Sequence, residues 1–386
     1  AIIMSKREDE EEIVRGTDID ALSSRLSCFL KGYLPEDKLL PAFVPLMAKF
    51  KVLSVESEFK QFALFRNLRK SFFNTISTRN IASNGSNINI ESARRKALKS
   101  PVINRGTWLR TISIDLVINR FLEQSKGEQV QILSLGAGSD TRAFRILPKY
   151  DGNVDYFEVD FEDSCKIKKY TILSNPVLSQ MLSIAHTGER PPINYNEFES
   201  CSSTLDSDCY HLVACDLRTF KDHKEVLPST FDWNKKTLVV SECCICYMST
   251  EDSNDLLRFL KHNLIQGAFL VYDPMGGEES NESRYGQVMV RNLRTRGIEM
   301  PNLMVYNTIE KQQQRFLSFG ISKFNLDVCD LKFVYEHWIP RDEIFRISRL
   351  EMLDELEELN LINSHYALIL GWWGFEFRPN LKSELS

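Results

Sequence analysis

One stretch near the middle of the chain limits the folds open to it, residues 130–145, which read V-Q-I-L-S-L-G-A-G-S-D-T-R-A-F-R. Residues 130–135 have the length and apolar character of a buried strand, Gly136 and Gly138 follow at once, and a helical pattern begins after them. A strand that passes through glycines into a helix is typical of the nucleotide-binding turn of open α/β sheets. Glycine permits the tight turn and lets a ligand approach the backbone where a Cβ would stand. Because two glycines also occur in ordinary tight turns, the residues that follow decide what this turn holds.

The features after the turn narrow the choice of ligand. Thr141 stands where a dinucleotide-binding motif has its third glycine, and no P-loop lysine follows. Asp160 ends the next apolar run, at a place where a carboxylate accepts hydrogen bonds from ribose hydroxyls. The sequence therefore predicts a nucleoside ligand without a pyrophosphate, and S-adenosylmethionine fits. The alternative is an ordinary sheet turn followed by a solvated aspartate.

Strand and helix patterns alternate through the rest of the chain. Strands are predicted at residues 130–135, 154–159, 210–215, 237–241 and 268–273, with helices between them and an amphipathic helix at 108–122 before the first. This order indicates an α/β fold with a mostly parallel sheet. A strand near 324–329, an amphipathic helix over 340–361 and a last strand at 365–370 suit the Rossmann-like, seven-stranded sheet of class I S-adenosylmethionine-dependent methyltransferases, with its reversed last strand.

Acidic residues stand at four successive predicted strand ends: Asp160, Asp216, Glu242 and Asp273. Ligands of open α/β sheets bind outside the carboxyl ends of the strands. We therefore expect Asp160 to hold a ribose, Asp216 to accept from an adenine amino group with Leu217 on the ring, and Glu242 to receive the ammonium of the methionine moiety. Each residue taken singly also suits a helix cap.

Charge and cysteine content exclude several classes of protein. The net charge is -5 and the isoelectric point about 5.8, so there is no general attraction to nucleic acid. No apolar run is long enough to span a bilayer, so no membrane partner is expected. Nine cysteines without a secretory leader indicate a reducing setting, cytoplasmic or also nuclear. The cysteines at 243–246 lack the partner spacing of a zinc site, and the acidic strand ends suit separate contacts better than one metal ion, so no metal site is predicted.

Several stretches together resemble the leucine carboxyl methyltransferases, which methylate the C-terminal leucine of the protein phosphatase 2A catalytic subunit. The resemblance runs from about residue 14 to 366, and the chain looks like a fungal member. The resemblance rests on V-R-G-T-D-I-D-A-L-S-S-R, I-N-R-G-T-W-L-R-T, L-G-A-G-S-D-T-R, Y-F-E-V-D-F, A-C-D-L-R, S-E-C-C-I-C-Y-M, R-Y-G-Q-V-M and L-E-M-L-D-E-L-E. The positions that it assigns to S-adenosylmethionine are Arg25, Arg110, Gly136, Asp160, Asp216, Leu217 and Glu242, and Gly138 of the turn belongs with them.

The residue pattern predicts a domain organisation, and the resemblance implies a partner. Residues 1–13 are expected to be a disordered acidic tail, 14–103 a helical cap with a basic insertion at about 51–93, and 104–386 the methyltransferase domain. The insertion is expected to be an accessory element, and a solvated helical face explains its charge more simply than a docking patch does. The implied partner is the C-terminal tail of the phosphatase catalytic subunit, whose methylation regulates holoenzyme assembly, and a monomer is expected.

The expected reaction is methyl esterification of a carboxylate. A carboxylate with a pKa near ~3.5 is already ionised at neutral pH, so it needs no general base, and none of the six histidines forms a catalytic pattern. Arg110 and Tyr247 are our candidates for positioning this carboxylate, although Tyr247 equally suits packing on the cap. Two other functions remain open: carboxyl methylation of a hypermodified tRNA base, whose enzymes carry a C-terminal β-propeller not seen here, and a non-catalytic scaffold that binds the phosphatase.

Overall fold

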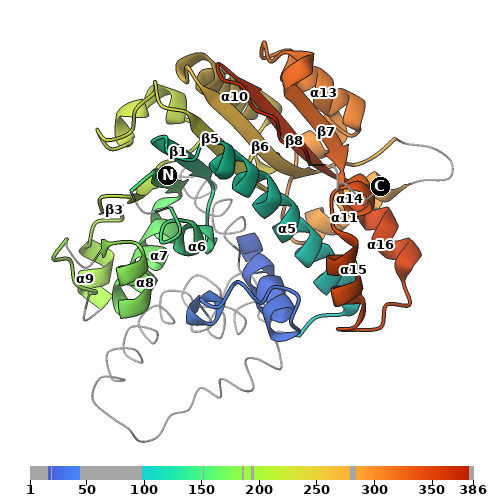
Figure 1. Cartoon of the computed structure of the whole chain (residues 1–386), viewed down its shortest axis with the longest axis horizontal. Helices are drawn as coiled ribbons and strands as arrows, with labels where there is room; N and C mark the ends of the chain where they lie inside the picture. The colour runs from blue at the N-terminus through green and yellow to red at the C-terminus, as the bar shows by residue number, and fades with distance from the viewer. Residues whose placement is uncertain are drawn as a thin grey trace, which may run out of the picture.

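The structure is a computed structural model that describes residues 16–18, 20–43, 98–150, 152–184, 187–192, 195–278 and 284–381 (Figure 1). The predicted acidic tail at 1–13 and the basic insertion at 51–93 lie outside the described residues. Near the N-terminus the backbone is helical at 16–18 and 20–30. The strands are β1 Val130–Leu135, β2 Val154–Asp160, β3 Leu205–Asp206, β4 Tyr210–Ala214, β5 Thr237–Glu242, β6 Gly267–Pro274, β7 Leu326–Asp330 and β8 Tyr366–Trp373.

Helices fill the connections between the strands. The α-helices are α5 Pro101–Gln124, α6 Arg142–Ile146, α7 Glu162–Ser174, α8 Pro176–Met181, α9 Tyr195–Ser200, α10 Thr250–Asn263, α11 Tyr285–Thr295, α12 Asn302–Val305, α13 Ile309–Leu317, α14 Leu331–His337, α15 Arg341–Ser348 and α16 Leu356–Asn363. Short 3-10 helices are η1 Leu40–Phe43, η4 Phe220–Asp222, η5 Lys224–Val226, η6 Ile245–Tyr247 and η7 Lys323–Asn325. No helix among these is both long and apolar enough to cross a membrane.

The strands form one sheet in the order β3-β4-β2-β1-β5-β6-β8-β7. β4, β2, β1, β5 and β6 are parallel neighbours, whereas β8 runs antiparallel between β6 and β7. This is the predicted class I methyltransferase sheet with its reversed last strand. The chain adds the two-residue strand β3, antiparallel to β4 at the edge, which the sequence analysis did not predict. Because these five strands are parallel, their carboxyl ends all lie on the same side of the sheet, at the ends of the strands. The predicted acidic residues stand along this carboxyl-end edge.

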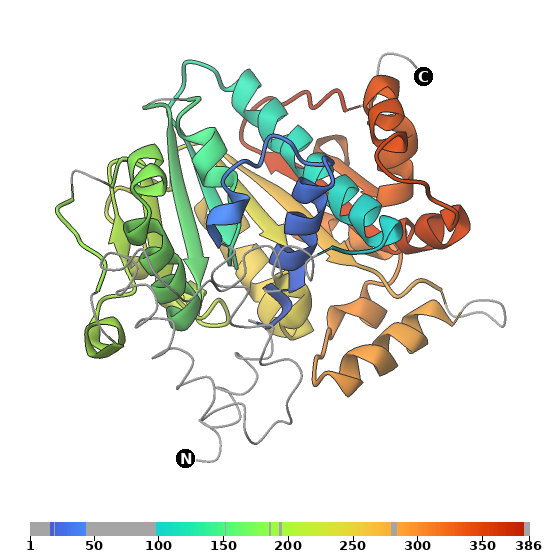
Figure 2. The ribbon, with the colours of Figure 1, turned by 90° about the horizontal axis from the view of Figure 1, so that it is seen from below.

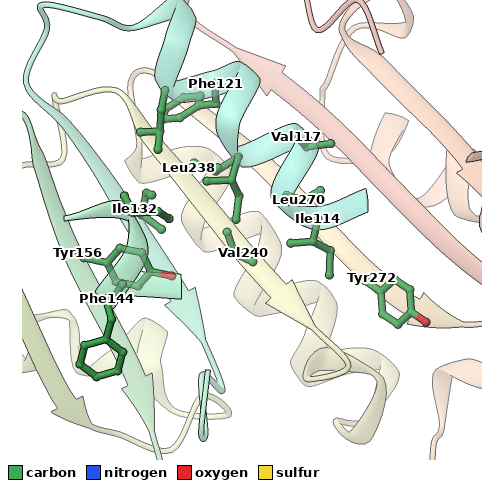
Figure 3. Close-up of a cluster of buried hydrophobic side chains, with 14 of the residues drawn as sticks. Ile114, Val117, Phe121, Ile132, Phe144, Tyr156, Leu238, Val240, Leu270 and Tyr272 are labelled. Carbon is green, nitrogen blue, oxygen red and sulfur yellow. The ribbon is translucent and has the colours of Figure 1, made fainter. Parts of the chain in front are cut away.

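Helices cover both faces of the sheet, so the central strands are buried throughout, as parallel strands usually are (Figure 1). On one face, Ile114, Val117 and Phe121 of α5 pack against alternate strand residues (Figure 3). The strand residues in this contact are Ile132, Tyr156, Leu238, Val240 and Leu270. The intervening strand residues, such as Leu133 and Phe269, form a second core with α10 on the opposite face. The apolar stripe of α5 therefore fixes this helix across the central strands.

From the predicted cap, residues 16–18 and 20–43 pack into the core of the sheet domain. Leu22, Leu26 and Phe43 are buried in the same cluster as α5, and the Phe43 ring lies 6.2 Å from that of Phe144 between centroids. Figure 2 shows this N-terminal segment in blue beside α5. The segment is thus held by apolar contacts on the edge of the sheet that carries the strand ends.

Two helix predictions had wrong bounds. The helix expected at 108–122 begins earlier, at Pro101, because proline is well suited to a first helical turn. The helix expected over 340–361 is two helices, α15 and α16, separated by residues 349–355. In that break the Glu351 carboxylate accepts from the Asn104 side-chain amide at 2.9 Å and from the Tyr33 hydroxyl at 3.1 Å. These partners from distant parts of the chain favour an open connector over a continuous helix.

Candidate active site

The glycine turn after β1 is confirmed, and the protein itself explains why it requires glycine. Gly136 and Gly138 have φ values of +60° and +50°, a region that residues with a Cβ rarely adopt. A Cβ on Gly136 would lie 2.5 Å from Cys244 Sγ, and one on Gly138 would lie 2.5 Å from Asp18 Oδ1. The same Asp18 oxygen accepts from the Ser139 amide at 3.1 Å and from its hydroxyl at 2.7 Å. The N-terminal helical segment therefore binds the turn directly, through an aspartate that was expected at most to cap a helix and was not predicted to act in the site.

Asp160 at the end of β2 is joined to this turn. One carboxylate oxygen accepts from the Gly138 amide at 2.7 Å, and the other accepts from the Phe161 amide at 2.7 Å. Burial raises the pKa of Asp160 to about 6, although the two amide donors act in the opposite direction. The carboxylate is half-buried and ionised at neutral pH. It can accept further hydrogen bonds, because each oxygen has more than one lone pair.

A chain of opposite charges crosses the site from Arg25 to Arg110. Arg25 donates to the Ser139 hydroxyl at 2.8 Å and lies 4.0 Å from Asp140. Arg142 contacts Asp140 at 3.2 Å and Glu242 at 2.6 Å, both through Nη1. The other Glu242 oxygen accepts from Arg110 Nε at 2.7 Å. The predicted residues Arg25, Glu242 and Arg110 are thus linked in one chain. The links between them are Asp140 and Arg142, which were not predicted to act in the site.

Burial and charge fix the ionisation of this chain. Burial alone would raise the pKa of Glu242, but the charges of Arg142 and Arg110 outweigh it and hold the pKa well below its usual range. Burial alone would lower the pKa of Arg110, but interactions with Cys243, Glu242 and Tyr272 raise that pKa well above the usual value. The groups stay charged at neutral pH, so they form a permanent electrostatic frame rather than a proton-transfer site.

Asp115 on α5 supports this frame. Its two oxygens contact Arg142 Nε at 2.7 Å and Arg145 Nη1 at 3.1 Å. The Arg142 side chain is only 3 % exposed, so three acidic partners offset the cost of burying its charge. The sequence signal that could have found this support is the pair of charged residues Asp140 and Arg142 between the glycine turn and a buried helix, since charged residues are rarely buried unless they are paired.

Asp216 and Leu217 lie beyond the end of β4, next to Asp160. The Cys215 amide donates to the Asp160 carbonyl at 2.9 Å, so the two strand ends are neighbours. The Asp216 carboxylate accepts from Arg218 Nη2 at 2.7 Å, and the Leu217 side chain is half-buried against the second core. Both residues therefore stand beside the ribose candidate, as expected from the strand order, and apart from the charged chain around Glu242.

Tyr247 lies in the turn that follows Glu242, within the 3-10 helix η6. Burial raises the pKa of its phenol well above the usual value, while a hydrogen bond with Thr17 and the charge of Arg110 act in the opposite direction. Asn302, on α12, also holds this turn: its side-chain amide donates to the carbonyls of Ile245 at 3.2 Å and Met248 at 3.4 Å. The turn is thus fixed between the N-terminal segment and α12, with Tyr247 near Arg110.

Comparison with known proteins identifies the family. The profile of the family described as leucine carboxyl methyltransferase matches residues 55–261. Leucine carboxyl methyltransferase 1 of Candida albicans is 33% identical over 98% of this chain and 97% of its own length. The chain belongs to the leucine carboxyl methyltransferase family. The Schizosaccharomyces pombe member is 35% identical over 72% of this chain and 83% of its own. Among solved structures, a DUF574 family protein from Streptomyces avermitilis matches with a TM-score of 0.44 and 12% identity, covering 77% of this chain and 95% of that one.

The family makes the chain a carboxyl methyltransferase that uses S-adenosylmethionine, as the sequence analysis expected. The residues at the strand ends fit this cofactor chemically. Asp160 and Asp216 offer carboxylate acceptors on neighbouring strands for hydroxyl and amino groups, and Arg25 and Arg110 offer cations for a carboxylate. Within the described residues the two terminal nitrogens of Arg110 make no hydrogen bond, and its side chain is 25 % exposed. No group of three metal-binding side chains occurs among the described residues.

Proposed function

We propose that this enzyme esterifies the C-terminal leucine carboxylate of the protein phosphatase 2A catalytic subunit, and so regulates assembly of the phosphatase holoenzyme. The named relatives, all called leucine carboxyl methyltransferase 1, support an acceptor of this class. The observation that carries the proposal is the guanidinium of Arg110: its Nε donates to Glu242, and its two terminal nitrogens donate to none of the described residues. Guanidinium groups bind carboxylates in a fixed, forked geometry.

The residues of the chain then act by orientation. The acceptor carboxylate is ionised at neutral pH, so no side chain has to remove a proton from it. Bound S-adenosylmethionine would supply the methyl group, carried on a positively charged sulfur. Arg110 and Tyr247 hold the acceptor oxygen in line, and Glu242 fixes Arg110 in turn. Such positioning, together with the removal of water, can provide a large share of a methyl-transfer rate enhancement.

The test is transfer of a labelled methyl group to purified phosphatase catalytic subunit. We expect label on the subunit with its free C-terminal carboxylate, and none on a subunit whose terminal carboxylate is amidated or whose last leucine is removed. Mild alkali should release the label, because methyl esters hydrolyse readily. Label on the amidated subunit, or label that survives alkali, would show that this chain does not esterify the C-terminus. Binding of the subunit without any transfer would favour the scaffold function instead.

The proposal also includes a cellular location and an oligomeric state. We place the enzyme in the cytoplasm, or also the nucleus, as a monomer that meets the C-terminal tail of its partner at the edge of the sheet where Arg110 and Tyr247 lie. Fractionation of cells that produce the tagged chain, and light scattering of the purified chain, test these two points separately.

A further inference from the structure

Arg110 contacts an aromatic ring as well as Glu242. Its Cζ lies over the ring of Tyr272, 5.1 Å from the ring centroid. Tyr272 is on β6, directly beside Glu242 of β5 in the sheet, and its side chain lies on the face of the sheet that α5 covers (Figure 3). An aromatic face attracts a guanidinium that lies within about 6 Å of its centroid, most strongly where water is excluded. Because Tyr272 is buried, its attraction for Arg110 is only weakly screened by water.

The Tyr272 ring is itself held in place by a second ring. Tyr366 of β8 stacks on it, with the centroids 5.3 Å apart and the ring planes 14° apart. The backbone pairing of β6 with β8 fixes these two residues on neighbouring strands. The sheet and the stacked ring together therefore set the orientation of Tyr272 under Arg110.

The hydrogen bond to Glu242 does not by itself orient the Arg110 guanidinium. Glu242 accepts from Nε at 2.7 Å. Rotation about the Nε–Cζ bond leaves Nε in place and keeps this hydrogen bond, but it turns the two terminal nitrogens relative to the Tyr272 ring. The ring attracts the charged group through its π-electrons, so the terminal N–H groups remain available to a carboxylate. Glu242 and Tyr272 thus restrict different movements of the same side chain.

We propose that Tyr272 is a positioning residue, whose ring holds the Arg110 guanidinium at the angle at which both terminal nitrogens meet the acceptor carboxylate. This inference rests on the proposed function, in which Arg110 binds that carboxylate. A positive charge alone would attract the carboxylate without fixing the direction of its oxygens. A forked pair of hydrogen bonds fixes both oxygens, and this fixed direction is what methyl transfer in line requires.

Ring fluorination separates the attraction of the ring from its shape. Phenylalanine at position 272 keeps the ring, and one, two or three ring fluorines weaken its attraction for a cation step by step with little change in size. With the phosphatase catalytic subunit as acceptor, we expect the acceptor KM to rise along this series, by roughly 2- to 30-fold in total. Tyr272→Phe should recover most of the acceptor affinity that Tyr272→Leu loses. A KM that stays constant along the series overturns the proposal, since a residue that only fills space gives no such trend.

Rotation of the guanidinium gives a second measurement, which needs no acceptor. Nuclear magnetic resonance of the side-chain nitrogens measures the rate of rotation about the Arg110 Nε–Cζ bond, and the signals that disappear in Arg110→Lys identify this side chain. We expect faster rotation in Tyr272→Leu and along the fluorine series. Phe375→Leu is the matched control, because Phe375 packs against the same core but lies under a different cation, Lys236, at 4.9 Å. This control should leave the rotation rate and the acceptor KM unchanged, and equal rotation rates in all these proteins contradict the proposal.

The two measurements keep this inference apart from the proposed function. If the rotation rate responds to fluorination but the phosphatase subunit accepts no methyl group, the proposed acceptor is wrong and Tyr272 still orients Arg110. If the subunit is methylated and neither the rotation rate nor the KM responds, the acceptor is supported and the role of Tyr272 is wrong.

Discussion

Replacing Asp160 by alanine tests the cofactor site at its most constrained point. The carboxylate accepts from the Gly138 and Phe161 amides in the free protein, so these donors lose a partner whether or not cofactor is present. Their loss therefore largely cancels in a binding measurement, and the hydrogen bonds from the ribose hydroxyls remain. Loss of these bonds to a charged acceptor costs roughly 1–3 kcal/mol. We expect Asp160→Ala to weaken S-adenosylmethionine binding by about 5- to 150-fold.

The pKa of Asp160 adds a pH dependence with a defined sign. Burial raises this pKa to about 6 from a usual value of 3.8, so the carboxyl is protonated in the folded protein below about pH 6. A protonated carboxyl is a weaker acceptor for the ribose hydroxyls. Affinity of the unaltered chain should therefore fall as the pH is lowered through about 6, whereas Asp160→Asn should bind weakly with little change across that range.

Titration calorimetry at several pH values measures both effects. Asp155→Asn is the matched control, because Asp155 lies on the same strand and its carboxylate is 3.8 Å from Lys235. This control should bind cofactor like the unaltered chain. Circular dichroism should show that each variant is folded. Unchanged affinity in folded Asp160→Ala, or the same weakening in Asp155→Asn, would refute the assignment of the ribose to Asp160.

Three further predictions concern the charged chain and the turn. Arg110→Lys should lose most methyl transfer although the charge is kept, because lysine has no fork, and Arg120→Lys on the same helix should not, as assays of both will show. Glu242→Gln should lower stability at pH 7 by roughly 3 kcal/mol, since it breaks a largely buried ion pair. The pKa of Glu242 is lower in the folded protein than its usual value of 4.5, so its ionised form stabilises the fold above pH 4.5 and this stabilisation is lost as the pH falls below 4.5. Thermal denaturation should therefore show that the stability difference between Glu242→Gln and the unaltered chain shrinks below pH 4.5. Asn302→Ala should raise the acceptor KM with little change in cofactor affinity, and an unchanged KM would contradict its role in fixing the turn.

Local chemistry was sufficient to predict much of the fold and part of the site. The buried strands were found from their apolar runs, since a strand covered on both faces needs no polar residue until it ends. The glycines were found because a strand entering a helix through a tight turn requires positive φ. With the strand order known from the class of fold, Asp160, Asp216 and Glu242 were placed along one edge, and the structure has them there.

Contacts between distant residues decided what local patterns could not. The apolar period at 340–361 continues through Glu351, yet partners at Tyr33 and Asn104 hold that residue in a break between two helices. No period or motif predicts such a break, because its energy comes from groups far away in the chain.

The charged frame of the site, from Arg25 to Arg110, also depends on contacts between residues that are distant in the chain. The sequence by itself determined which side chains reach the edge of the sheet, because strand ends and glycine turns are set by local backbone preferences. Only the tertiary structure decided that Glu242 joins Arg110 to Arg142, residues 132 and 100 positions away in the chain. Burial then made that pairing necessary, since charges taken out of water are stable in a fold only beside opposite charges.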